Sequence, residues 1–169
     1  PLRRPPKTAP RQPATALPLR LPVQDVYKFD HRRIIAGRIE SGRLAVGDRI
    51  LFSPANRTAR IASIESWGDD RKVLEASAGQ SVGITLDDQI FVERGDVASH
   101  EDNPPPESDV FEARLFWLGN EPLKPGSRWT LRFNTRLIPA TVEHIRRTID
   151  ADALEAREAS EVPRDAIAD

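Results

Sequence analysis

Apolar and polar residues alternate with a period of two along most of this chain. The clearest runs lie at residues 82–86, 111–117 and 129–133, where every second residue is apolar. Such alternation is typical of strands that bury one face. The pattern therefore predicts an all-β chain. Its strands are expected at about residues 19–28, 33–43, 48–53, 57–66, 81–86, 90–93, 109–118, 127–133 and 136–146.

Two proline-rich stretches divide the chain. Five prolines fall within residues 1–16, which are otherwise small and basic, so this stretch is expected to be an extended linker. The second stretch, residues 100–108, contains three successive prolines, which neither a helix nor a central strand accommodates. Residues 17–99 are expected to form a closed antiparallel Greek-key β-barrel. Residues 109–169 are expected to form a second, incomplete barrel, in which residues 151–159 are either a short acidic helix or a loop.

The apolar positions of the first module predict which residues form its core. A fully buried large aliphatic side chain contributes about 1.5–3 kcal/mol, so a dozen of them can support an independent barrel. The expected core residues are Val23, Val26, Ile35, Ile39, Leu44, Ile50, Phe52, Ile61, Ile64, Val82, Ile84 and Leu86. In the second module we expect Trp117, Trp129 and Phe133 to form the core, and we expect this module to be only marginally stable.

Composition narrows the class of protein. The chain has 169 residues, 38% of them hydrophobic, and a net charge of −1, which gives no overall attraction to nucleic acid or to an anionic membrane. It contains no cysteine, which excludes disulfides and thiolate chemistry and is consistent with the cytoplasm. No apolar run is long enough to span a bilayer. Methionine is absent even at position 1, so we expect the chain to be a segment of a longer polypeptide.

Candidate chemistry is sparse. A phosphate-binding loop of the form G-x-x-x-x-G-K-[ST] is absent, because no glycine precedes a lysine anywhere in the sequence. No G-x-S-x-G nucleophile elbow occurs either. The paired carboxylates at residues 69–70 and 87–88 lie beside turn residues, which favours a structural role over acid–base catalysis. We therefore predict no catalytic residue and no cofactor-binding residue in this chain.

The histidines do not form a metal motif. His31, His100 and His144 are far apart in the sequence and lack the close spacing that metal sites usually show. His144 falls on a predicted strand, where a partly buried or rim position is expected, and His31 is expected in a loop. No metal site is predicted.

The most suggestive local feature is an aromatic and basic cluster at residues 27–33. It contains Tyr27, Phe29, Arg32 and Arg33. Aromatic rings next to arginines can stack on bases and neutralise phosphates. They can also anchor a protein interface, since tyrosine and arginine are enriched there. A simple hairpin loop is the third interpretation, and the residues alone leave all three open.

Two ordered stretches resemble a known family of domains. Residues 36–50 contain the pattern G-x-[IV]-x-x-G-x-[LI]-x-V-G-D, and residues 76–86 followed by 92–97 read AGxxVGIxL and then RGDV. Together they are similar to the second domain of translational GTPases such as elongation factor Tu. The resemblance covers about residues 17–99 and implies that barrel fold.

Further residues resemble one branch of this superfamily, the GTP-binding subunit 1 of sulfate adenylyltransferase. Residues 19–26 match the strand hxxPVQxV that opens its barrel, and residues 112–118, 122–126 and 145–150 are similar to its third domain. Residues 27–33 look closer to bifunctional versions that are fused to an adenylylsulfate kinase. In this family the third domain continues beyond the position that matches Asp169, which implies a truncated second barrel.

The resemblance implies a role without catalysis for this segment. In the family, an upstream GTPase domain holds GTP and Mg²⁺ and couples GTP hydrolysis to adenylyl transfer from ATP to sulfate on a separate catalytic subunit. No motif of the GTPase or the kinase is present here to carry over. The implied partners are the catalytic subunit and the GTPase domain of the same polypeptide, with no membrane and no nucleic acid. The alternative is a barrel that binds RNA or tRNA, as in a translation factor.

Overall fold

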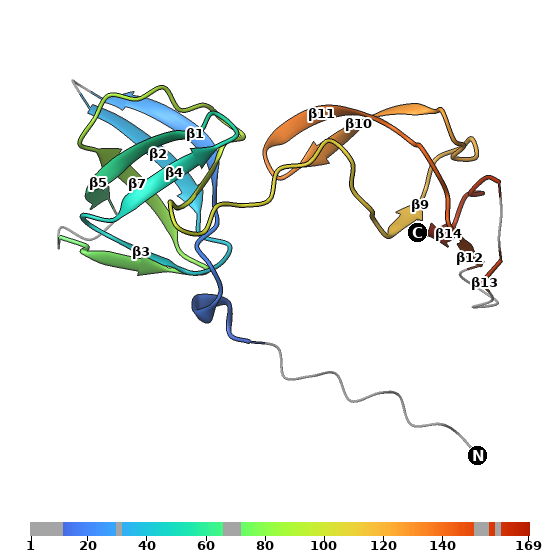
Figure 1. The fold of residues 1–169 in the computed structure, drawn as a ribbon, viewed down its shortest axis with the longest axis horizontal. Helices are drawn as coiled ribbons and strands as arrows, with labels where there is room; N and C mark the ends of the chain where they lie inside the picture. Colours follow the sequence, from blue (N-terminus) through green and yellow to red (C-terminus); the bar gives the residue numbers. More distant parts are fainter. Residues whose placement is uncertain (1–11, 30–31, 66–71, 151–155, 158–159) are drawn as a thin grey trace, which may run out of the picture. The chain divides into compact units, whose positions relative to one another are not determined.

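A computed structural model describes residues 12–29, 32–65, 72–150, 156–157 and 160–169 (Figure 1). Contacts divide the chain into two compact units, one of residues 1–107 with 134–136 and the other of residues 108–133 with 137–169. Of the predicted N-terminal linker, residues 12–16 are described. They are exposed and include a short 3-10 turn, η1 (Ala14–Ala16).

The first unit is a closed antiparallel barrel. Its strands pair in the order β1–β2–β7–β5–β4–β8, and β8 pairs with β1 to close the ring. The ring closes where Leu21 and Pro22 of β1 pair with Ala98 and Val97 of β8. The barrel strands are β1 (Leu21–Phe29), β2 (Arg32–Arg38), β4 (Arg49–Ser53), β5 (Arg57–Glu65), β7 (Ser81–Leu86) and β8 (Val97–His100).

Alternation along these strands fills the barrel with aliphatic side chains. Most of the predicted first core is buried, including Phe52 and Ile84, which are fully inaccessible to solvent. Val26 and Leu86 are only partly buried because they lie at one end of the barrel beside a cavity. The list of expected core residues omitted five residues that are buried: Leu19, Leu21, Ala76, Val92 and Ala98.

Two short segments that lie between barrel strands in the sequence form a separate two-stranded sheet. β3 (Arg43–Ala45) pairs with β6 (Glu75–Ser77), and β6 was not predicted. The predicted strand at 33–43 ends early, at Arg38, because the chain turns at Gly42. Gly42 has φ +75°, and a Cβ there would lie 2.5 Å from the backbone N and Cα of Leu19. Only glycine fits both the dihedral angle and the close approach.

The predicted strand at 90–93 is wrong. The last barrel strand is β8 at 97–100, which follows a turn at Gly95 with φ +98°. Residues 87–96 form no strand and cross one end of the barrel, and Val92 in this crossing is buried as part of the barrel core. Alternation alone did not separate an apolar residue that covers a barrel end from one that lies in a strand.

Two arginines hold the start of the predicted 100–108 linker against the barrel. Arg20 donates from Nη1 to the carbonyl of Asn103 at 3.0 Å and from Nη2 to that of Pro104 at 3.3 Å. Arg49 Nε lies 2.8 Å from Glu101 Oε2. The linker therefore begins as a fixed extension of β8.

The described residues of the second unit form two separate small sheets. One is the hairpin of β10 (Arg128–Phe133) and β11 (Arg136–Thr141), and the other has the order β13–β12–β14–β9. The predicted strands 109–118 and 136–146 are longer than the observed ones. The four-stranded sheet consists of β9 (Leu115–Trp117), β12 (Thr148–Asp150), β13 (Ala156–Arg157) and β14 (Ala166–Ala168). Most of the possible helix at 151–159 lies outside the described residues, and its described part is β13.

The core of the second unit differs from the prediction. It is formed by Leu123, Ile145, Val162, Ala166 and Ala168, with Trp117 packed against it. Trp129 and Phe133 are 44% and 59% exposed, so the expectation that they are core residues is wrong. They belong to the hairpin, where Trp129 packs edge-to-face on Trp117 with ring centroids 4.8 Å apart and Leu131 is partly buried.

Candidate functional site

The aromatic and basic cluster lies at the free ends of β1 and β2. These strands pair so that Tyr27 is opposite Ile34, Lys28 opposite Arg33, and Phe29 opposite Arg32. Tyr27 is 50% exposed, and both arginines are exposed. The side chain of Phe29 lies outside the described residues. The structure thus brings three of the four predicted interface residues to one end of the first barrel.

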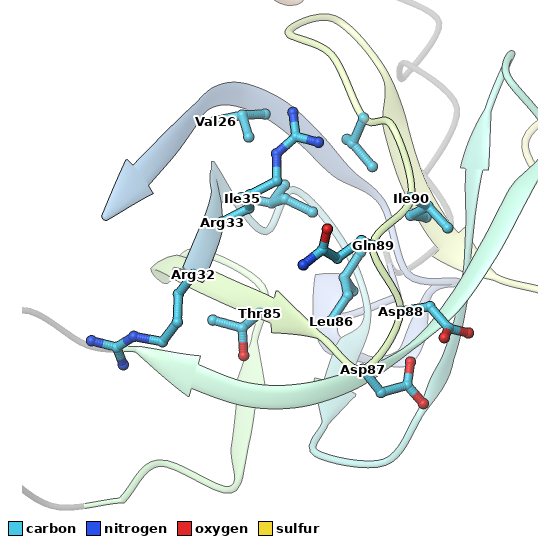
Figure 2. Close-up of a pocket in the computed structure, with 11 residues that line it drawn as sticks. Val26, Arg32, Arg33, Ile35, Thr85, Leu86, Asp87, Asp88, Gln89 and Ile90 are labelled. Carbon is cyan, nitrogen blue, oxygen red and sulfur yellow. The ribbon is translucent and has the colours of Figure 1, made fainter. Parts of the chain in front are cut away.

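A cavity of about 210 Å³ opens at this same end (Figure 2). β1 and β2 form one side of it, and the end of β7 with the crossing 87–92 forms the other. Its interior is apolar and its rim is polar. Figure 2 shows the two arginines on one side and Asp87 and Asp88 on the other, with the Gln89 side chain between them. The lining residues are Val26, Arg32, Arg33, Ile35, Thr85, Leu86, Asp87, Asp88, Gln89, Ile90 and Val92.

A chain of polar contacts connects Arg32 to the barrel wall. Arg32 Nη1 lies 3.7 Å from Glu65 Oε1, and that oxygen accepts a 2.8 Å hydrogen bond from Ser63 Oγ. Ser63 Oγ is also 2.6 Å from Thr85 Oγ1. The contact to Glu65 is a long one between exposed groups, which is worth little in stability. Its effect is to restrain Arg32, which points away from the centre of the cavity (Figure 2).

Arg33 has a different environment. Its guanidinium carbon lies 5.8 Å from the centroid of the Phe91 ring, which is a cation–π contact. Across the β1–β2 ladder it faces Lys28, and like charges in directly opposed positions repel each other. Neither Arg33 nor Lys28 forms an ion pair with any residue that the structure describes. This side of the rim therefore carries positive charge that is not neutralised by a described carboxylate.

The crossing 87–92 supplies the residues that sequence reasoning missed. Gln89 and the 56% exposed Phe91 join the cluster only because this segment spans the barrel end. Asp87 Oδ1 accepts a 2.8 Å hydrogen bond from the backbone N–H of Arg60, so it has a structural role. A structural role was expected for this carboxylate, and its partner lies in strand β5. The pair at 69–70 lies outside the described residues.

The two described histidines, His100 and His144, belong to different compact units. His100 Nε2 lies 3.2 Å from Asp48 Oδ2, and the same oxygen accepts a 2.8 Å hydrogen bond from the Ala45 N–H. His144 is exposed and lies beyond β11, so the expected strand position is wrong. His31 lies outside the described residues. Among those that are described, no three histidine or acidic side chains gather to hold a metal ion.

A carboxylate in the second unit is strongly paired. Arg114 donates to Asp169 from Nε at 2.5 Å and from Nη2 at 2.9 Å, and Arg147 Nε also contacts Asp169 Oδ2. Hydrogen bonds from the two guanidinium groups hold the pKa of Asp169 well below its ordinary range, and the same contact raises the pKa of Arg114. This cluster joins the end of β14 to neighbouring loops and borders no cavity described here.

The arrangement at the barrel end is suited to binding. It offers an apolar cavity, exposed aromatic rings and charges of both signs, which are features of binding surfaces. No described helix is long and apolar enough to cross a membrane.

No protein-family model matches the chain. It is 39% identical over 145 residues to the bifunctional enzyme NodQ of Azospirillum brasilense, covering 85% of this chain and 23% of that protein. The bifunctional enzyme CysN/CysC of Xylella fastidiosa is 35% identical over 138 residues, which are 81% of this chain and 22% of that enzyme. Sulfate adenylyltransferase subunit 1 of Alteromonas mediterranea is 33% identical over 142 residues, which are 83% of this chain and 30% of that subunit.

Solved structures show the same fold. Sup35 complexed with GDP superposes with a TM-score of 0.82 at 19% identity, over 92% of this chain and 38% of that one. Sup35 complexed with GMPPNP superposes with a TM-score of 0.73 over 92% of this chain and 39% of that one, also at 19% identity. The expected all-β fold, with a barrel like the second domain of elongation factor Tu, is confirmed.

Proposed function

Since this chain belongs to the family of sulfate adenylyltransferase subunit 1, of which it covers a segment, we propose that it is a non-catalytic β-barrel module of such a subunit. In this role the barrels support the GTPase domain, which holds GTP and Mg²⁺, and contact the catalytic subunit that transfers adenylyl to sulfate. Two of the similar proteins are bifunctional, so a kinase fused to the same polypeptide belongs to the proposal. The cytoplasm is the proposed compartment.

The observation that carries this proposal is the aromatic and basic end of the first barrel. Tyr27 is half exposed there, and Arg32 and Arg33 flank an apolar cavity. Interfaces concentrate their binding energy in tyrosine and arginine side chains around an apolar centre. We therefore assign the contact with the catalytic subunit to Tyr27, Phe29, Arg32 and Arg33.

Calorimetry of the chain with the cognate catalytic subunit tests the proposal. Arg33→Glu is expected to weaken binding about tenfold, or about 1.4 kcal/mol, because it places a repulsive charge at the interface. Arg38→Glu is the matched control, since Arg38 is an exposed arginine at the other end of the same strand. Binding by a full-length subunit but none by this chain would assign the interface to the GTPase domain and refute the proposal.

The alternative of an RNA-binding barrel is an outcome of the same experiment. A barrel that binds RNA shows an affinity that falls steeply with salt, because each phosphate contact releases counterions. The acidic side of the rim, formed by Asp87 and Asp88, opposes a polyanion at this end. Tight, salt-dependent binding of tRNA without binding of the catalytic subunit would favour the alternative.

A further inference from the structure

We propose that the barrel-end cavity receives one apolar side chain from an acidic segment of a partner protein. The inference deepens the proposed function and rests on it for the identity of the partner. It assigns the chemistry of the contact, which the relatives do not specify.

The size and lining of the cavity indicate the apolar anchor. An apolar cavity of about 150 Å³ accommodates a benzene molecule, so about 210 Å³ is enough for a leucine-sized or phenyl side chain. The lining side chains Val26, Ile35 and Leu86 are aliphatic, and Val26 and Leu86 remain partly accessible at the barrel end. An inserted side chain would thus continue the barrel core outward.

The charges around the cavity indicate the flanking residues of the partner. Lys28 and Arg33 oppose each other without an ion pair to any described residue. A carboxylate placed between them would relieve this repulsion and gain charge-assisted hydrogen bonds. Arg32 lies beside them and is restrained by Glu65 at 3.7 Å. An acidic segment is therefore complementary to this side of the rim.

The opposite side of the rim distinguishes a protein segment from a nucleic acid. Asp87 and Asp88 lie across the cavity from the arginines in Figure 2. They would repel a continuous row of phosphates, whereas a peptide can place its carboxylates on one side only. The two aspartates also orient the segment, because its acidic end is directed toward Arg33.

The test uses the full chain and short acetylated peptides, with binding measured by NMR titration. A heptapeptide with three glutamates before a central leucine and three glycines after it is expected to bind and to shift the amide signals of Arg33 and Gln89. Alanine in place of the leucine is expected to weaken binding about tenfold, because the buried apolar area is lost. A peptide with lysines in place of the glutamates is expected not to bind.

Filling the cavity provides a second test. Gln89→Trp places a large ring among the lining side chains from an exposed position, so the barrel core is not altered. It is expected to weaken binding of both the acidic peptide and the catalytic subunit at least tenfold. Gln24→Trp is the matched control, because Gln24 is exposed on β1 and does not line the cavity.

The outcomes separate this inference from the proposed function. Binding of the catalytic subunit that is unaffected by Gln89→Trp and by excess acidic peptide would refute the cavity inference and leave the proposed function standing. Binding of the acidic peptide, with no binding of the catalytic subunit, would support the chemistry assigned to the cavity and refute the proposed function. Stronger binding of a uridine hexanucleotide than of the acidic peptide would overturn the inference in favour of RNA.

Discussion

The close approach of Gly42 to the segment before β1 makes a sharp prediction about the stability of the first barrel. Gly42→Ala adds a methyl group that meets Leu19 backbone atoms at 2.5 Å, and the residue has φ +75°. The left-handed conformation costs an alanine about 1–2 kcal/mol. Forcing extra volume into a packed site adds about 1–3 kcal/mol. We therefore expect Gly42→Ala to lower the free energy of unfolding of the barrel by about 2–5 kcal/mol.

Gly47→Ala is the matched control. Gly47 has φ +93°, but a Cβ there meets no atom within 4 Å, so only the conformational cost of about 1–2 kcal/mol applies. Native-state hydrogen exchange of the slowest amides in β2 and β7 measures the global stability of the barrel, and the amides of β14 in the second unit serve as an internal reference. Equal decreases in the free energy of unfolding of the two variants would show that the close approach of residue 42 to Leu19 does not add to the destabilisation.

Three further predictions concern packing, charge and the linker. Phe52→Ala is expected to lower the free energy of unfolding of the barrel by about 3–5 kcal/mol in urea unfolding. Phe133→Ala, at a side chain that is 59% exposed, should change the free energy of unfolding by less than about 0.5 kcal/mol. Comparable losses of stability in the two variants would contradict the difference in burial between Phe52 and Phe133. Because the pKa of Asp169 is lowered in the folded chain, its pairing stabilises the fold fully above the unfolded-state pKa, and this stabilisation is lost as the pH falls through the lower folded-state pKa. An NMR titration of the Asp169 carboxyl should therefore show a pKa below the ordinary range of aspartate. A pKa within that range would exclude the pairing. Arg20→Ala removes the donor to the Asn103 carbonyl, so the turn in which the Asn103 N–H donates to the His100 carbonyl should open more often and that amide should exchange faster, while β2 and β7 remain protected. Unchanged exchange of the Asn103 amide would show that other contacts hold the start of the linker.

Much of the first barrel could be predicted from the sequence because its strands obey one rule. Each has one face toward the core, so residues such as Ile35 and Ile84 are identified by alternation alone. The position of the last strand could not be predicted in this way. Val92 is as apolar as a strand residue, but it lies in the segment that crosses the barrel end, and the turn at Gly95 separates it from β8.

The core of the second unit was harder to predict, because alternation does not show which apolar face of a strand is covered by other residues. Trp129 and Phe133 lie in a regular strand, yet both are largely exposed. Its observed core depends on Val162 and Ile145, which lie outside regular strands and come together only through tertiary contacts. Isolated apolar residues of this kind carry no periodic signal.

The candidate site was found in part. The cluster of Tyr27 with Arg32 and Arg33 was visible because aromatic and basic residues are adjacent in the sequence. The cavity beside it was not visible, since it depends on Gln89 and its neighbours crossing the barrel end about sixty residues later in the chain. A site formed by distant segments requires the topology before it can be recognised.

The most direct test of the proposed interface is hydrogen exchange of the chain with and without the cognate catalytic subunit. We predict slower exchange at residues 26–29, 32–33 and 85–92, which lie around the barrel-end cavity, and unchanged exchange in β3 and β6. Protection confined to other surfaces, or none at saturating catalytic subunit, would contradict the assignment of this barrel end as the contact surface.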